Sequence, residues 1–181
     1  MSGIMIKDIF KLNFIPMPIN VKDMTFDISR TIDLIKDKKP KLIILGGSVM
    51  LFPQPIKEIS EVAHLNGSII FYDASHVAGL IASGLFQNPY LEGADIVTFT
   101  TCKTIPGPQS AVILSRQKYA EKLKRAVFPV LTSGHYLHET AGAVLALIEL
   151  KAFGKSYAGK TIENAQILAR ELYSKGFKIL Y

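Results

Sequence analysis

The chain has 181 residues, of which 49% are hydrophobic and 20% are charged, and its formal net charge at pH 7 is +6. This composition indicates a globular protein with a sizeable core rather than a disordered one. Its basic residues are scattered over predicted helix surfaces without the interleaved aromatics of a nucleic-acid groove, so we expect no nucleic-acid partner. No apolar run reaches the roughly 18 residues of a membrane span and no signal peptide is evident, so we expect a cytoplasmic protein without a membrane partner.

The first part of the chain alternates helical and extended patterns. Ile28, Ile32 and Ile35 lie along one face of a predicted helix that Pro40 ends. The apolar run at 41–45 is typical of a strand buried on both faces of a parallel sheet. In chain order we predict an extended segment at 10–15, a helix at 27–38, a strand at 41–45, a helix at 55–65 and a strand at 68–72.

The second part continues this pattern and then becomes mainly helical. A strand at 95–99 is followed across Pro106-Gly-Pro108 by a strand at 110–114, which is close enough for a tight antiparallel return. Helices are predicted at roughly 116–126, 138–152 and 157–175, followed by a final strand at 177–180. We therefore predict one α/β domain over 1–181, a three-layer, mostly parallel sheet with flanking helices, and we expect it to be a fragment because it stops within a new strand.

Polar residues follow several of the predicted strands, at the sheet edge where ligands bind in such folds. Lys103 and Asp73 each come just past an apolar strand. A lysine amine and an aspartate are the two fixed points of a pyridoxal phosphate site, because the amine forms a Schiff base with the cofactor aldehyde and the carboxylate keeps the pyridine nitrogen protonated. Ser48 and His76 fall at the same predicted edge.

Three segments carry a more specific resemblance. The chain reads Asp73-Ala-Ser-His-Val-Ala-Gly-Leu-Ile-Ala82, then Asn88-Pro89, then Ala94-Asp-Ile-Val-Thr-Phe-Thr-Thr-Cys-Lys-Thr-Ile-Pro-Gly-Pro-Gln109. These segments, with Lys39-Pro-Lys-Leu-Ile-Ile-Leu-Gly-Gly-Ser48 upstream, resemble the large domain of serine hydroxymethyltransferase, a pyridoxal phosphate enzyme of the aspartate aminotransferase fold. The resemblance covers roughly 10–181, and regions corresponding to the family's N-terminal segment and C-terminal small domain are not matched.

The resemblance implies a role for each matched position. It implies that Lys103 forms the Schiff base, that Asp73 pairs with the pyridinium nitrogen, and that Thr100 and Thr101 surround the lysine and steer its proton transfers. It also implies that His76 and Ser48 lie near the ring and its phenolic oxygen.

The implied reaction is the retro-aldol cleavage of a β-hydroxy amino acid, with tetrahydrofolate as a further co-substrate. The implied assembly is a homodimer in which the loop 128–135, including Gly134, meets the partner's cofactor phosphate.

Some positions depart from the family pattern. Cys102 stands where a histidine precedes the lysine, Phe99 replaces a threonine, and Gln109 replaces an arginine. These changes suit a second reading, a folate-independent aldolase or transaldolase acting on threonine-type substrates. A third reading is a noncatalytic or split subunit whose partner chain supplies the unmatched regions, and we expect the chain by itself to be inactive.

The remaining sulfur and imidazole groups indicate no metal site. Cys102 is the one cysteine of the sequence, which excludes an internal disulfide framework and a multi-cysteine zinc site. The histidines at 64, 135 and 138 are too dispersed to form a metal-binding motif.

Overall fold

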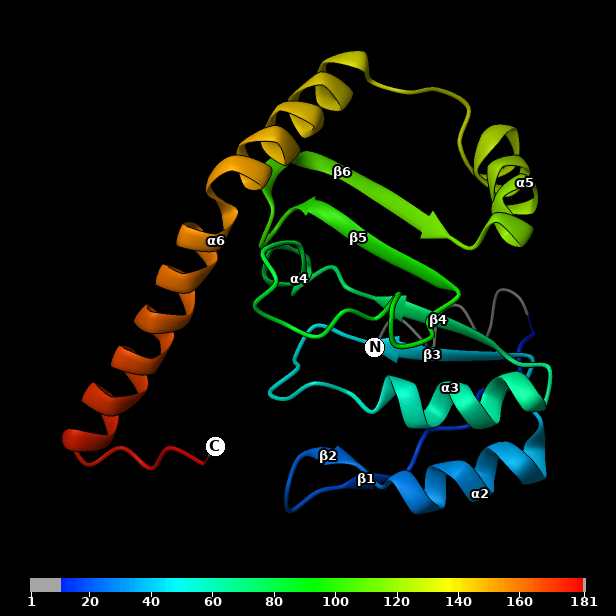
Figure 1. Cartoon of the computed structure of the whole chain (residues 1–181), viewed down its shortest axis with the longest axis horizontal. Coiled ribbons are helices and arrows are strands. Elements are labelled where there is room, and N and C mark those ends of the chain that lie inside the picture. The colour runs from blue at the N-terminus through cyan, green and yellow to red at the C-terminus, as the bar shows by residue number, and fades with distance from the viewer. Residues whose placement is uncertain (1–10, 181) are drawn as a thin grey trace.

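In the computed structural model, which describes residues 11–180, the main sheet has four strands in the order β3-β4-β5-β6 (Figure 1). The first three strands run parallel, and β6 runs antiparallel to β5. This arrangement confirms the mostly parallel α/β sheet and the tight antiparallel return, but the turn lies at 103–105 because Pro106 already belongs to β6. The strands are β3 (Leu42–Gly46), β4 (Ile69–Asp73), β5 (Ile96–Cys102) and β6 (Pro106–Ser115), and a separate ribbon pairs β1 (Ile19–Asn20) with β2 (Thr25–Phe26).

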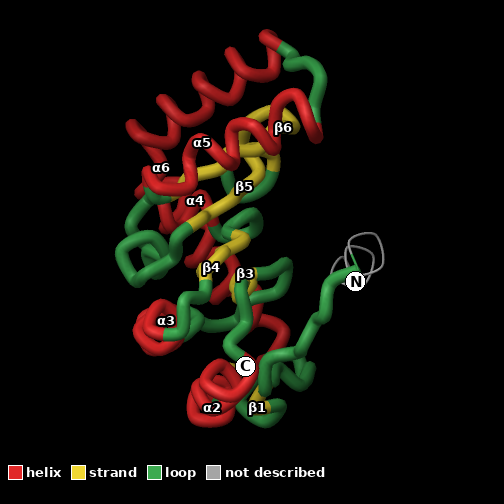
Figure 2. Tube along the Cα trace, turned by 90° about the vertical axis from the view of Figure 1, so that its right-hand side faces the viewer, coloured by secondary structure: helices red, strands yellow, loops and turns green. Residues whose placement is uncertain are grey.

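Three helices, α2, α3 and α5, begin and end close to where the sequence predicts them, whereas α4 was not predicted. The Asp27 carboxylate caps α2 by accepting the Arg30 N–H at 3.0 Å, and Lys39 ends that helix in the left-handed region, just before Pro40. Figure 2 shows α2 beside α3 at one end of the molecule, and Figure 1 shows α6 beginning beside β6 and running down one side of the molecule. The helical elements are α2 (Ile28–Lys38), α3 (Ile56–Leu65), α4 (Ala78–Ala82), α5 (Gln117–Arg125), the irregular turn η1 (Ala126–Leu131) and α6 (Leu137–Ser174).

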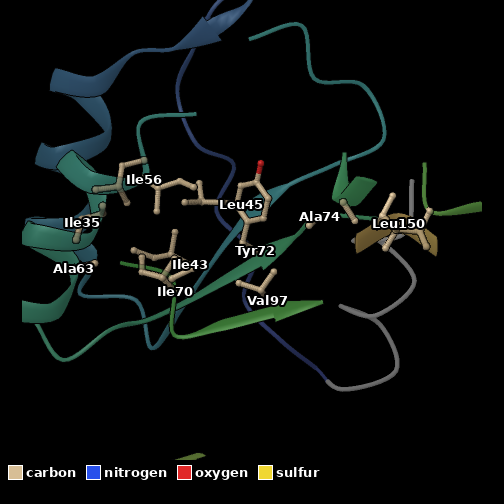
Figure 3. Close-up of a cluster of buried hydrophobic side chains, with 14 residues drawn as sticks. Ile35, Ile43, Leu45, Ile56, Ala63, Ile70, Tyr72, Ala74, Val97 and Leu150 are labelled. Atoms are coloured by element: carbon tan, nitrogen blue, oxygen red, sulfur yellow. The ribbon is translucent and has the colours of Figure 1, made fainter. Parts of the chain in front are cut away.

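The core lies between the sheet and α3. Ile70 and Tyr72 on β4 point to the same side as the buried residues of β3, and they pack with Ile56 and Ile59 of α3, all four being fully buried (Figure 3). Burying each of these side chains stabilises the fold by roughly 1.5–3 kcal/mol.

The opposite face of β3 is different from what its apolar run predicts. Leu42 is 46% exposed and Ile44 is 43% exposed. On β6, Ile113 is similarly exposed, at 42%. The prediction that the 41–45 strand is buried on both faces is therefore wrong within 11–180, because the second face keeps its solvent contact.

Residues 137–174 form one continuous helix, so the prediction of two helices interrupted near 153–156 is wrong. Gly154 is buried at a helix contact, where an added Cβ would lie 2.9 Å from the Ser83 Oγ beyond the end of α4. The glycine thus allows close packing rather than ending the helix.

Two predicted extended segments form no strand. The structure assigns none at 11–15 or at 177–180, and Phe10 lies outside the described residues. An apolar run becomes a strand only where a neighbour accepts its backbone hydrogen bonds.

None of the helices found between residues 11 and 180 is both long and apolar enough to cross a membrane.

Candidate active site

Asp73 is the last residue of β4, at the carboxyl edge of the sheet. The Ser75 backbone N–H donates to Asp73 Oδ1 at 2.9 Å, which fixes the carboxylate and turns the chain toward His76 and α4. Within 11–180 no second hydrogen bond to this carboxylate is seen, so its Oδ2 remains open to a ligand. A fixed, half-solvated carboxylate suits a protonated ring nitrogen.

Lys103 follows β5 in the turn to β6, and α4 holds that turn. The Gly79 N–H donates to Thr104 Oγ1 at 3.1 Å. A Cβ added to Gly79 would lie 2.1 Å from the Thr104 carbonyl oxygen, so only glycine permits this approach. Ile105 is 1% exposed and anchors the far side of the turn. The lysine therefore stands on a backbone fixed from both sides.

A cavity of about 270 Å³ lies beside this turn. It brings together Lys103 and His76, two of the residues that the sequence places at the site. Its other walls come from α4 and from α6, and it is lined by His76, Gly79, Leu80, Lys103, Thr104, Tyr157, Ala158 and Thr161. Sequence reasoning missed the three residues of α6. The small residues Gly154 and Ala158, one helical turn apart, were the signal that this helix packs closely on another element.

The two threonines before the lysine face opposite sides of the sheet. Thr101 is fully buried, and its hydroxyl donates to the Pro108 carbonyl at 2.6 Å, which ties β5 to β6. Thr100 Oγ1 is buried and has no hydrogen-bond partner among the described residues. Since Thr98 pairs with Asp73, Thr100 lies on the Asp73 face, two residues closer to the lysine.

Each of these groups has chemistry that suits one part of a pyridoxal phosphate molecule, although only Lys103 among them lines the cavity. The amine of Lys103 suits an aldehyde, the open Asp73 oxygen suits a ring N–H, and the orphaned Thr100 hydroxyl suits a further polar atom.

The other predicted site residues do not line this cavity, namely Ser48, Asp73, Thr100, Thr101 and Gly134. Ser48 is exposed just beyond Gly46, which pairs with Asp73 and so brings the end of β3 beside the end of β4. The backbone approach here is close, because a Cβ on Gly46 would lie 2.1 Å from the Asp73 carbonyl oxygen. Gly134 is exposed between η1 and α6, with nothing within 4 Å of an added Cβ.

A model of the family "Serine hydroxymethyltransferase" matches residues 4–181. This family has the aspartate aminotransferase fold, which is the class that the mostly parallel sheet and its helices represent. The chain belongs to the serine hydroxymethyltransferase family.

Curated relatives with that name show how much of the family the chain represents. It is 50% identical over 169 residues to a serine hydroxymethyltransferase of Archaeoglobus fulgidus, covering 93% of this chain and 39% of the relative. The corresponding protein of Methanosphaera stadtmanae is 48% identical over 170 residues, covering 94% and 40%. That of Korarchaeum cryptofilum is 48% identical over 159 residues, covering 87% and 37%. The chain thus spans about two fifths of the length of these relatives.

Proposed function

We propose that this chain is the cofactor-binding part of a pyridoxal phosphate enzyme that cleaves β-hydroxy amino acids such as serine. The observation that carries the proposal is the joint placement of Lys103 and His76 in one cavity at the sheet edge where Asp73 ends β4. When bound, the cofactor supplies an electron-poor ring that stabilises the carbanion left by breaking a bond to the substrate's α-carbon.

The chain's own residues divide the work of holding that cofactor. The Lys103 amine would hold the cofactor through its aldehyde carbon. Asp73, held by the Ser75 N–H, would pair its second oxygen with the ring nitrogen. Thr100 offers its unpartnered hydroxyl close to the lysine, while Thr101 keeps the β5–β6 turn in place through Pro108. His76 and Ser48 would hold the ring from the neighbouring strand ends.

Several features of the whole enzyme belong to the same proposal. The substrate is a small amino acid, tetrahydrofolate accepts the one-carbon unit, and the cytoplasm is the site of action. Two copies form a dimer through the exposed loop 128–135, where Phe128, Val130 and Leu131 are 57–74% exposed. In this arrangement Gly134 lies at the partner's cofactor phosphate.

A specific observation favours a second proposal, that full activity needs further polypeptide. The exposed apolar face formed by Leu42, Ile44 and Ile113 is unusual for a mostly parallel sheet, which is normally covered on both faces. We infer that 181 residues alone do not convert serine to glycine at an enzymatic rate. A folate-independent aldolase remains the alternative reaction, and the exposed Cys102 in the family's histidine position is the feature that favours it.

The experiment that tests the cofactor proposal is chemical trapping. The chain is incubated with pyridoxal 5′-phosphate and reduced with borohydride, and the labelled peptide is identified by mass spectrometry. We expect the label on Lys103, its loss in Lys103→Ala, and no change in Lys57→Ala, which alters an exposed lysine of α3 outside the cavity. Preferential labelling of any other lysine would contradict the proposal.

A further inference from the structure

The wall of the Lys103 cavity that α6 contributes carries two hydroxyl groups, and nothing in the sequence motifs assigns them a role. We propose that Thr161 and Tyr157 are positioning residues that orient the Lys103 amine for attack on a small polar aldehyde. The inference deepens the proposed function, on which it rests, and extends the site to a helix that begins more than thirty residues after the lysine.

The packing of α6 on α4 places this wall. Ala158 is 2% exposed, and Gly154 is buried one turn earlier. A Cβ added to Gly154 would meet the Ser83 Oγ at 2.9 Å, so the two helices approach closely. Thr161 and Tyr157 flank this contact on the same helix and open onto the cavity. Their position relative to the lysine turn therefore depends on rigid packing, because α4 also contacts Thr104 through Gly79.

The hydrogen bonds of Thr161 determine which group it can bind. Its hydroxyl proton is donated to the Tyr157 carbonyl at 3.0 Å. With its proton committed to that carbonyl, the Thr161 oxygen can serve a further partner only as an acceptor, and the partner it suits is an N–H donor. Two lining residues, Lys103 and His76, carry side-chain N–H donors, and Lys103 is the one whose amine can also attack an aldehyde.

Tyr157 complements this acceptor with a donor. Its side chain is 53% exposed, and its hydroxyl makes no hydrogen bond with the residues described between 11 and 180. A free phenol O–H can donate to the oxygen of an incoming aldehyde. The cavity volume of about 270 Å³ is at the small end of ligand sites. Together, these features favour a small aldehyde bound through its oxygen, next to the amine that attacks it.

The covalent step is a simple condensation. The lysine nitrogen adds to the aldehyde carbon, the oxygen takes up a proton, and loss of water leaves a carbon–nitrogen double bond. No oxidant or further reactant is needed. Borohydride then reduces that double bond and records how often the amine has attacked.

The test measures the rate of trapped adduct formation on Lys103 in the full chain with two aldehydes, pyridoxal 5′-phosphate and acetaldehyde. We expect Thr161→Val and Tyr157→Phe each to lower this rate by about three- to tenfold, the loss expected for one hydrogen bond. Thr161→Ser, which keeps the hydroxyl, should retain the wild-type rate. Tyr173→Phe is the matched control, because this exposed tyrosine lies on α6 away from the cavity.

Each outcome decides between the proposals. Slower labelling of Lys103 by both aldehydes in Thr161→Val, with rescue in Thr161→Ser, supports the positioning role. Equal rates in the wild type, Thr161→Val and Tyr157→Phe overturn it, as does an equal loss in Thr161→Ser, which would indicate a purely structural effect. If acetaldehyde labels Lys103 but pyridoxal phosphate does not, the cofactor proposal is refuted. The rates of labelling by acetaldehyde in the wild type and the variants still decide whether Thr161 and Tyr157 orient the amine.

Discussion

Gly79 is the position where one added methyl group should damage both the fold and the candidate site. In Gly79→Ala the new Cβ would lie 2.1 Å from the Thr104 carbonyl oxygen and 2.7 Å from its carbonyl carbon. Ordinary non-bonded contact is about 3.5 Å, so α4 or the lysine turn must move by roughly 1.4 Å. Both clashing atoms belong to the backbone, which means that no side-chain rotation relieves the clash.

The expected cost of Gly79→Ala has two parts. Overpacking costs roughly 1–3 kcal/mol, and losing the hydrogen bond from the Gly79 N–H to Thr104 costs roughly 0.5–1.5 kcal/mol. For a chain of this size the sum lowers the unfolding midpoint by roughly 5–15 °C. Because the displaced turn carries Lys103, the rate of trapping by pyridoxal phosphate should also fall.

The assay is thermal unfolding followed by circular dichroism, together with Lys103 trapping at a temperature where all variants are folded. The control is Gly159→Ala, because an added Cβ there meets nothing within 4 Å and alanine favours the α6 helix by up to about 1 kcal/mol. The reasoning is refuted if Gly79→Ala unfolds at the same temperature as Gly159→Ala and labels Lys103 at the wild-type rate.

Three further predictions concern stability, pH and association. Burial alone would raise the pKa of Asp95, but a backbone N–H of β4, His64 and a lysine of α5 together lower it. The ionised Asp95 therefore stabilises the fold above about pH 4, and this stabilisation is lost as the pH falls through the lowered pKa. Urea unfolding should therefore show Asp95→Asn less stable than wild type by roughly 1–3 kcal/mol at pH 7. A difference in unfolding free energy between the two proteins that does not shrink toward pH 3 would contradict this. Ile59→Ala should cost about 2–5 kcal/mol in the same assay because Ile59 is fully buried, whereas Leu65→Ala, at an 88% exposed position, should cost little. Light scattering should show a dimer that Leu131→Glu weakens, and a wild-type monomer at micromolar concentration would rule out the proposed assembly.

The sequence was sufficient to predict the central strands and the residues at their carboxyl ends. Apolar runs near 41–45, 68–72 and 95–99 indicated the parallel strands, and all three are present. Since parallel strands align their carboxyl ends at one sheet edge, Asp73 and Lys103 had to come from neighbouring strand ends. That inference needs only the order of elements, which local sequence encodes well.

The α6 side of the candidate site could not be predicted in the same way. A Phe-Gly-Lys-Ser sequence at 153–156 suggests a break, because glycine disfavours an isolated helix. Whether Gly154 breaks the helix or packs depends on Ser83, more than seventy residues earlier, and no local pattern contains that contact. The prediction that both faces of β3 are buried was wrong for a related reason. An apolar strand indicates that its faces tend to be covered, but it does not indicate which segment covers them.

The geometry of the lysine turn therefore depends on two glycine contacts rather than on the lysine motif alone. Gly79 lets α4 reach the backbone of Thr104, and Gly154 lets α6 reach the end of α4. Through these contacts a displacement of α6 would pass by way of α4 to the turn that carries Lys103. A variant can consequently keep every residue of the motif and still lose the site, because catalytic groups act only when neighbouring packing holds them within a fraction of an ångström of the productive position.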